Sequence, residues 1–227
     1  MKTRLIASVL AIVLLLGLSA CGEFAALEPA VQYLQEGKEE KTIVIPEAVV
    51  NLTEEDEILL NGELKDGVYI NRYFGMKLSV PEGWTLKRLN DDATESTEMI
   101  PLRQAYEDEM NGLFFTASSD SFNGYIDVYI TALKDDERGL SEEELVKKYI
   151  DDIWAINKAF GDDERPEYAR AMLAGEEHPV SLSRSETDAG ERVFAAFSIP
   201  RGDFKYDISI SAASGELEDL TGFFEKI

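Results

Sequence analysis

Short segments in which every second residue is apolar recur along most of the chain, a pattern typical of β-strands that bury one face. In the segment 74–80, the residues Phe74, Met76, Leu78 and Val80 fall on one side. Such segments predict strands at 68–71, 74–80, 113–117, 125–133, 168–174, 179–183, 192–199 and 204–212. Short turns rich in Gly, Pro and Asp separate the last four, so we expect these four strands to form an antiparallel meander.

Apolar residues at helical spacing mark further segments. A helix is predicted over 141–160, because Ser141 and Glu144 form a capping box in front of a long apolar stripe, which we expect to be packed in the core. A short helix is predicted within 99–110 and a closing helix over 215–226. This order of elements indicates an α+β fold, a mostly antiparallel sheet covered by helices.

The N-terminus has the layout of a secretory signal. The cationic residues Lys2 and Arg4 precede the almost wholly apolar run 5–20, which is short for a membrane-spanning helix. The run ends in a tetrad that resembles the bacterial lipobox, made of Leu18, Ser19, Ala20 and Cys21. The resemblance implies that residues 1–20 are removed and that Cys21 carries the lipid, and two acyl chains give stable membrane attachment. An ordinary signal peptide with an unrelated Cys21 is the alternative.

The segment 21–66 is strongly acidic, and we interpret it as an extension or tether in front of a domain that spans 67–227. Residues 43–45 and 48–50 flank Pro46 and are expected to be strand-like. We expect the extension to be partly ordered and to pack on the domain, with a wholly disordered tether as the alternative.

Charge excludes several classes of function. The chain of 227 residues holds 45 acidic and 22 basic residues, a net charge of −23, and loss of the signal would make it −25. Such a chain lacks the basic face that nucleic-acid binding needs. A single Cys and a single His exclude a Cys/His zinc site and an intramolecular disulfide. Apolar residues still make up 44% of the chain, enough for a core, so the acidity does not indicate disorder.

No catalytic motif stands out. His178 lies in a polar turn between two predicted strands, without a positioned nucleophile or acid, and we expect a surface histidine there. The chain has no nucleophile elbow, Walker loop, zinc-protease helix or dinucleotide fingerprint. We therefore expect no catalytic residue and no cofactor.

Acidic pairs and tyrosines are the remaining candidates for binding chemistry. Four Asp pairs supply oxygen ligands of the kind that suit Ca²⁺, namely Asp91-Asp92, Asp135-Asp136, Asp151-Asp152 and Asp162-Asp163. None matches a calcium loop, and neighbouring side chains diverge, so we expect solvated acidic surface and no metal site. Tyr125 and Tyr129 share a strand face with Asp127 and Thr131 and would suit a carbohydrate or peptide surface, but we expect that face to be packed.

The start of the domain resembles a known group of proteins. Two motifs carry the resemblance, Tyr69-x-Asn71-x-Tyr73-Phe74-Gly75 and Pro81-x-Gly83-Trp84. They look like the opening of small secreted and lipoprotein domains of Gram-positive gut bacteria, whose fold is the α/β/α sandwich of the photosystem II extrinsic P protein (PsbP) and the Mog Ran-binding protein. The resemblance covers about 67–227. It implies that fold and a cell-surface setting, and it implies no reaction.

The sequence thus predicts a membrane-anchored extracytoplasmic lipoprotein. We expect a non-catalytic binding or scaffolding domain held at the cell membrane by its N-terminal lipid, with an envelope protein or an extracellular ligand as partner. The alternative is a module or enzyme that uses clustered carboxylates and a metal such as Ca²⁺.

Overall fold

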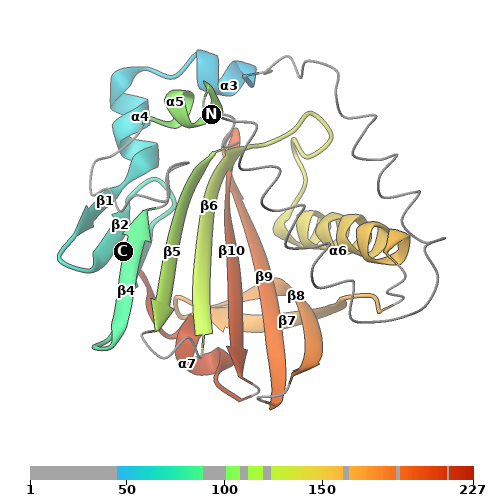
Figure 1. The fold of residues 1–227 in the computed structure, drawn as a ribbon. Coiled ribbons are helices and arrows are strands. Elements are labelled where there is room, and N and C mark those ends of the chain that lie inside the picture. The colour runs from blue at the N-terminus through green and yellow to red at the C-terminus, as the bar shows by residue number, and fades with distance from the viewer. Residues whose placement is uncertain are drawn as a thin grey trace, which may run out of the picture. The chain divides into compact units, whose positions relative to one another are not determined.

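The computed structural model describes residues 45–88, 101–107, 112–119, 124–160, 164–187, 190–213 and 215–227. The chain divides into two compact units, Met1–Thr42 and Ile43–Ile227, and the described residues all belong to the second. Its strands form two antiparallel sheets (Figure 1). The described part of the segment 21–66 therefore lies within the same unit as the sheets.

Seven strands form the larger sheet. Their order is β4 (Trp84–Arg88), β5 (Leu113–Ser119), β6 (Gly124–Ala132), β10 (Phe204–Ala213), β9 (Gly190–Arg201), β8 (Glu176–Thr187) and β7 (Glu167–Leu173). Each strand runs antiparallel to its neighbours, and β7 to β10 follow one another as the predicted meander. Strand β10 also pairs with β6, so β6, β10 and β9 are interior strands with both edges hydrogen-bonded.

A smaller sheet and five described helices complete the unit. The small sheet has the order β1 (Glu63–Lys65), β2 (Val68–Asn71), β3 (Met76–Ser79) and β11 (Phe224–Lys226). The helices are α3 (Glu47–Val50), α4 (Glu54–Asn61), α5 (Leu102–Glu107), α6 (Glu142–Ala159) and α7 (Leu217–Thr221). The predicted α+β fold, with antiparallel sheets covered by helices, is confirmed. Within the described residues, none of the helices combines the length and apolar character needed to cross a membrane.

The core is formed by one face of the large sheet together with the small sheet. Alternation along β6 and β10 places fully buried side chains on this face, among them Ile126, Val128, Ile130, Tyr206, Ile208 and Ile210. Rings from β2 and from the turn between β2 and β3 pack on this face of the large sheet. The ring centroids of Tyr69 and Phe115 are 4.3 Å apart, and those of Phe74 and Tyr206 are 5.1 Å apart. Burial of these large rings supplies much of the stabilisation that holds the two sheets together.

Two residues of the Tyr69-x-Asn71 motif connect α4 to β2. The Asn71 side-chain amide donates to the Leu60 carbonyl at 2.7 Å, and the Tyr69 hydroxyl donates to the Asn61 carbonyl at 3.1 Å. These bonds satisfy carbonyls at the end of α4, which have no partner inside the helix. The motif therefore explains how the helix that precedes the small sheet is fixed to it.

Helix α6 begins as predicted. The Ser141 hydroxyl accepts from the Glu144 N–H, and the Glu144 carboxylate accepts from the Ser141 N–H, which together form the capping box. The helix packs on β7, β8 and β9, at one end of the large sheet (Figure 1). Its apolar stripe is buried only in the first half, at Leu145, Val146 and Ile150. Ile156 and Phe160 are 53% and 78% exposed, so the expectation that the whole stripe is core is wrong for the second half.

Two predictions of secondary structure are wrong. Residues 48–50 were expected to be strand-like, but residues 47–50 form the helix α3. The N–H groups of Val49 and Val50 donate hydrogen bonds to the Pro46 carbonyl, which closes a helical turn. The closing helix ends at Thr221, and residues 224–226 pair with β3 as strand β11. Phe224 is buried in this strand, although its spacing from the preceding apolar residues is that of a helix.

Candidate ligand-binding groove

A cavity of about 1130 Å³ lies between the first half of α6 and the outer face of the large sheet. We call it the α6 groove. Strands β6, β10 and β9 line it with Tyr129, Thr131, Asp207, Ser209, Phe194 and Ser198. Helix α6 adds Lys148, Tyr149 and Asp152, and the loop after β6 adds Lys134, Asp135, Glu137 and Arg138. The groove is slightly larger than the about 300–1,000 Å³ typical of a pocket for one small ligand.

Strand alternation makes the floor of the groove polar. Along β6 and β10 the odd-numbered residues face away from the core, since their even-numbered neighbours fill it. The register then places Asp207 beside Tyr129 on one side and beside Ser198 on the other. Hydroxyl, carboxyl and phenol groups from three strands therefore share one surface.

The two tyrosines of β6 are not packed. Tyr125 and Tyr129 are 36% and 37% exposed, which contradicts the expectation that this face is packed. The physical reason is the position of α6, which packs mainly on β7, β8 and β9. Burial, together with the nearby Asp127 carboxylate, still raises the pKa of Tyr129 to about 12. A phenol is protonated at neutral pH even at its ordinary pKa, so Tyr129 can donate a hydrogen bond here.

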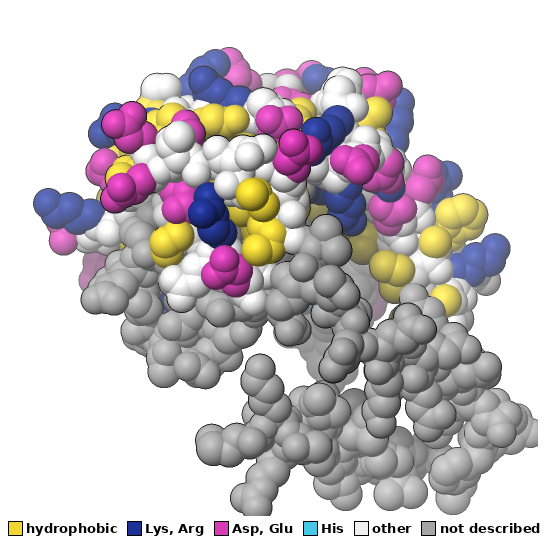
Figure 2. Space-filling view, turned by 90° about the horizontal axis from the view of Figure 1, so that it is seen from above, with side chains coloured by type: hydrophobic (Ala, Val, Ile, Leu, Met, Phe, Trp, Pro, Cys, Tyr) yellow, Lys and Arg dark blue, Asp and Glu magenta, His cyan; other side chains and the backbone are white. Residues whose placement is uncertain are grey.

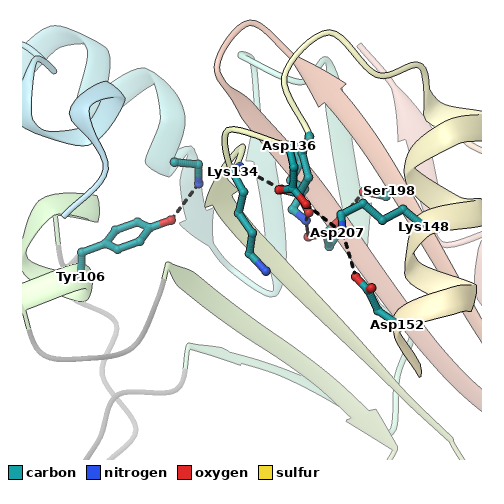
Figure 3. Close-up of polar contacts among 10 residues, drawn as sticks. Tyr106, Lys134, Asp136, Lys148, Asp152, Ser198 and Asp207 are labelled. Atoms are coloured by element: carbon teal, nitrogen blue, oxygen red, sulfur yellow. Dashed lines mark hydrogen bonds and ion pairs between the residues drawn. The ribbon is translucent and has the colours of Figure 1, made fainter. Parts of the chain in front are cut away.

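A largely buried ion-pair network forms part of the floor and rim of the groove (Figure 3). The Lys205 ammonium lies 2.8 Å from Glu137 Oε1 and 3.5 Å from Asp207 Oδ2. The Ser198 hydroxyl donates to Asp207 Oδ1, and the Lys134 N–H donates to Glu137 Oε2 at 2.9 Å. The network joins the loop after β6 to strands β9 and β10, which fixes the floor of the groove relative to its rim.

The two carboxyl groups of this network respond differently to burial. Burial raises the pKa of Asp207, and the Lys205 ammonium and the Ser198 hydroxyl do not offset it. Burial acts on Glu137 in the same direction, but the hydrogen bonds from Lys205 and from the Lys134 N–H outweigh it and lower its pKa. Glu137 is therefore the firmly ionised partner of Lys205, whereas Asp207 takes up a proton more readily than a solvent-exposed aspartate.

A second ion pair fixes the wall of the groove. The Lys148 ammonium of α6 lies 3.0 Å from Asp136 and 3.2 Å from Asp152, between the loop after β6 and its own helix (Figure 3). The hydrogen bonds that the Lys148 ammonium donates to these two carboxylates raise its pKa. At the far end, the Tyr106 hydroxyl accepts from the Ala132 N–H at 2.8 Å. Helix, loop and sheet are thus held around the cavity before any ligand binds.

Charge in the groove is nearly balanced. Its lining contains five acidic residues, Glu47, Asp135, Glu137, Asp152 and Asp207, and four basic ones, Lys134, Arg138, Lys148 and Lys205. The whole chain, by contrast, has about two acidic residues for each basic one. The view from above likewise shows acidic and basic side chains interspersed over the described surface (Figure 2).

The structure describes only some of the residues that the sequence singled out. Leu18, Ser19, Ala20 and Cys21 lie outside the described residues, as do Asp91-Asp92 and Asp162-Asp163. In the other two pairs, Asp136 and Asp152 bind Lys148, Asp135 lies 3.6 Å from Arg138, and Asp151 binds Arg165. No group of three or more metal-ligating side chains occurs in the described part of the chain.

His178 differs from its expected surface position. It is only 7% exposed, and its Nδ1 lies 2.8 Å from the Glu142 carboxylate at the start of α6. The turn at Gly175 is tighter than the sequence suggested, so β8 starts at Glu176 and His178 lies within a strand that α6 covers. The histidine thus helps to hold the helix that forms one wall of the groove.

Sequence reasoning missed the buried network of Glu137, Lys205 and Asp207. One signal was available, since Lys205, Asp207 and Ser209 alternate with apolar residues along a predicted strand in the middle of the meander. Charged residues on an interior strand must either face solvent or be paired. Their partner Glu137 comes from a loop 68 residues earlier, and no local pattern shows that contact.

Comparisons with known proteins gave structural likenesses alone. No model of a protein family matches the chain, and no curated protein matches it. The chain is similar to the solution structure of cyanobacterial PsbP (CyanoP) from Synechocystis sp. PCC 6803, with a TM-score of 0.42 and 12% identity over 70% of this chain and 91% of that one.

Two crystal structures show weaker likeness. A Bacteroides thetaiotaomicron protein matches with a TM-score of 0.36 and 10% identity over 74% of this chain and 49% of that one. LpqN, involved in cell envelope biogenesis of Mycobacterium tuberculosis, matches with a TM-score of 0.29 and 12% identity over 65% of this chain and 76% of that one. Likenesses with TM-scores below 0.5 carry no functional conclusion, and the α6 groove remains the feature that bears on function.

Proposed function

We propose that the chain is a non-catalytic binding protein of the cell surface, anchored to the membrane by a lipid on Cys21, and that it binds its ligand in the α6 groove. The observation that carries the binding role is the groove itself. Aromatic, hydroxyl and charged side chains converge on one cavity whose walls are held by ion pairs. A few fixed polar groups in a preformed concave site are the usual features of a ligand pocket.

The charged groups of the groove support a binding role over a catalytic one. Glu137 and Asp207 share the Lys205 ammonium, and Asp136 and Asp152 share Lys148. A general base must reach a proton on the substrate, and a carboxylate already held by an ammonium is poorly placed to accept it. The network is better suited to hold the groove in shape.

Blocking the groove tests the binding role. Ser209→Trp places an indole on the groove floor, whereas Ser185→Trp places one on an exposed position of β8 outside the groove. A library of small polar and aromatic fragments is screened by saturation-transfer NMR against the full-length protein in detergent. We expect fragments that bind the wild type and Ser185→Trp but not Ser209→Trp. Fragments that bind all three proteins equally, or no binding at all, would refute the proposal.

The anchor has a separate test. Cys21→Ala removes the thiol that accepts the lipid, so labelling with a tagged fatty acid should disappear and the protein should leave the membrane fraction. Ser209→Trp serves as the control and should stay labelled and bound. Unchanged membrane partitioning of Cys21→Ala would show that lipid at this residue is not the anchor.

Calcium separates the binding role from a metal-dependent one. The Asp residues of the described pairs are already held by Lys or Arg, so about 1 mM Ca²⁺ should leave the melting temperature of the full-length protein unchanged. A rise of several degrees that chelation reverses would favour the metal-dependent alternative.

A further inference from the structure

We infer that the ligand of the α6 groove is an uncharged oligosaccharide. The inference rests on the proposed binding role of the groove and names the chemical class of its ligand. Four properties of the lining carry it: its charge, its hydrogen-bonding groups, its exposed ring and the pairing of its floor strands.

The nearly balanced charge of the lining favours an uncharged ligand. Five acidic and four basic residues line the groove, and both central lysines are already in ion pairs. A phosphate or a carboxylate on the ligand would meet one more acidic than basic residue. Three of the four basic residues, Arg138, Lys148 and Lys205, are already paired with carboxylates, and Lys134 alone has no ion pair among the described residues. An amine would compete with the same lysines for their carboxylates. A neutral ligand leaves the pairs intact.

The groove presents donors and acceptors in close alternation. Tyr129, Thr131, Ser198 and Ser209 carry hydroxyl groups, which donate and accept, and Asp207 is an acceptor beside them. Thr131 Oγ1 is buried and has no hydrogen-bond partner among the described residues. A buried hydroxyl without a partner destabilises the free protein, and a ligand hydroxyl at this position would satisfy it. A sugar ring offers such hydroxyl groups on every side.

The exposed ring supplies the apolar part of the contact. Tyr129 lies on the groove floor and is 37% exposed. One face of a pyranose ring carries several C–H groups and packs well on an aromatic face. A wholly apolar ligand is disfavoured, because it would bury the hydroxyl and carboxyl groups of the floor without partners.

Strand pairing distinguishes a sugar from a peptide. Peptides that bind to sheets usually add a strand to a free edge and use backbone hydrogen bonds. The floor strands β6, β10 and β9 are interior, and both edges of each are already paired. The floor strands therefore offer a ligand side chains alone. Its volume of about 1130 Å³ suits several sugar units.

An array of neutral, acidic and amino oligosaccharides tests this class, with a tetra-alanine peptide as the non-sugar probe. The full-length protein is applied in detergent, and each hit is measured by isothermal titration calorimetry. We expect binding of at least one neutral oligosaccharide. Tyr129→Ala should weaken it tenfold or more. Tyr168→Ala, which removes a tyrosine of β7 outside the groove, should leave it unchanged.

Thr131→Val gives an independent test that keeps the side-chain shape. Loss of one hydrogen bond predicts about two- to tenfold weaker binding of the same oligosaccharide, with no loss in melting temperature. Unaltered affinity in both Tyr129→Ala and Thr131→Val would overturn the inference, as would the absence of any neutral hit.

The outcomes also separate the ligand class from the binding role. Binding of charged oligosaccharides or of the peptide alone, abolished by Ser209→Trp, would overturn the sugar class and leave the binding role standing. If neither the array nor the fragment library gives binding that Ser209→Trp abolishes, both proposals fail.

Discussion

Replacing Lys205 with methionine would keep the aliphatic stem and remove the ammonium shared by Glu137 and Asp207. The Glu137 side chain is only 7% exposed, whereas that of Asp207 is 26% exposed. Loss of one partner from a buried ion pair destabilises a protein by about 3–5 kcal/mol, because a charge remains buried without compensation. Since water reaches Asp207, we expect a loss near the lower limit, about 3 kcal/mol in the free energy of unfolding.

The pH dependence of this loss has a definite sign. In the wild type the pKa of Glu137 is lowered, so its contribution to stability is present above its unfolded pKa and is lost as the pH falls through its folded pKa. In Lys205→Met, burial acts without the ammonium and raises the pKa of Glu137, as it already does for Asp207. Both carboxyls then gain protons as the pH falls, so the difference in stability between wild type and variant should narrow from pH 7 to about pH 4.

Urea unfolding of the full-length protein, followed by tryptophan fluorescence at both pH values, measures the effect. Lys77→Met is the matched control, because Lys77 forms a 3.0 Å ion pair with the exposed Glu225. We expect Lys77→Met to lower the free energy of unfolding by less than about 1 kcal/mol. The double variant with both Lys205→Met and Glu137→Gln should lose less free energy of unfolding than the sum of the losses in the two single variants. A loss below about 1 kcal/mol for Lys205→Met, with no narrowing at low pH, would refute the reasoning.

Three further changes test the small sheet and the core, each by urea unfolding. Asn71→Ala removes the buried amide that donates to the Leu60 carbonyl at 2.7 Å, and should lower the free energy of unfolding by about 2–3 kcal/mol. Tyr206→Phe removes a fully buried hydroxyl that has no hydrogen-bond partner among the described residues, and should raise it by up to about 1 kcal/mol. Gly62→Ala should cost at least about 2 kcal/mol, because Gly62 has φ 65° and ψ −168° and a Cβ there would lie 2.5 Å from a β2 carbonyl oxygen. Gly67→Ala, at φ 73° in open space, should cost about 1 kcal/mol, and equal losses for the two glycines would contradict the steric argument.

Much of the large sheet was predictable because strand alternation and turns are local signals. The last four strands were found in order from their periodicity and from the short turns between them. The start of α6 was equally clear, since a capping box needs only Ser141 and Glu144. These features depend on residues that are close in sequence, so one sequence suffices to find them.

The errors occurred where distant segments determine the structure. Residues 224–226 have apolar residues at helical spacing, but they complete the small sheet by pairing with β3, which comes almost 150 residues earlier. The exposed state of Tyr129 depends on where α6 crosses the sheet, which the alternation along β6 does not encode. Prediction of a packed face assumed a helix over every strand, and the groove exists because α6 covers only one end of the sheet.

The sequence did not predict the groove, because segments that are distant in the sequence form it. Its residues come from β6, β9, β10, α6 and the loop after β6, and each of these looks like solvated surface when taken alone. Lys205 illustrates this, because a lysine on a strand normally faces water. The contact with Glu137 turns it into a buried structural group. A polar face on interior strands was the available sign, and it became informative once the register placed Ser198, Asp207 and Tyr129 side by side.

Salt dependence connects the acidity of the chain with the neutrality of the groove. Apart from its five acidic and four basic lining residues, the chain carries 40 acidic and 18 basic residues, so the negative field arises outside the groove. Salt screens such a field over about 10 Å at 0.1 M, and it screens short pairs such as Lys205 with Glu137 much less. An uncharged ligand should therefore bind with the same affinity at about 0.05 M and 0.5 M salt, whereas a cationic ligand should lose affinity as the field is screened and an anionic one should gain it. Calorimetric titration at both salt concentrations distinguishes the three cases. A change in affinity of more than about tenfold between the two salt concentrations would show that the ligand carries charge. The balanced charge of the lining would then not explain which ligand the groove binds.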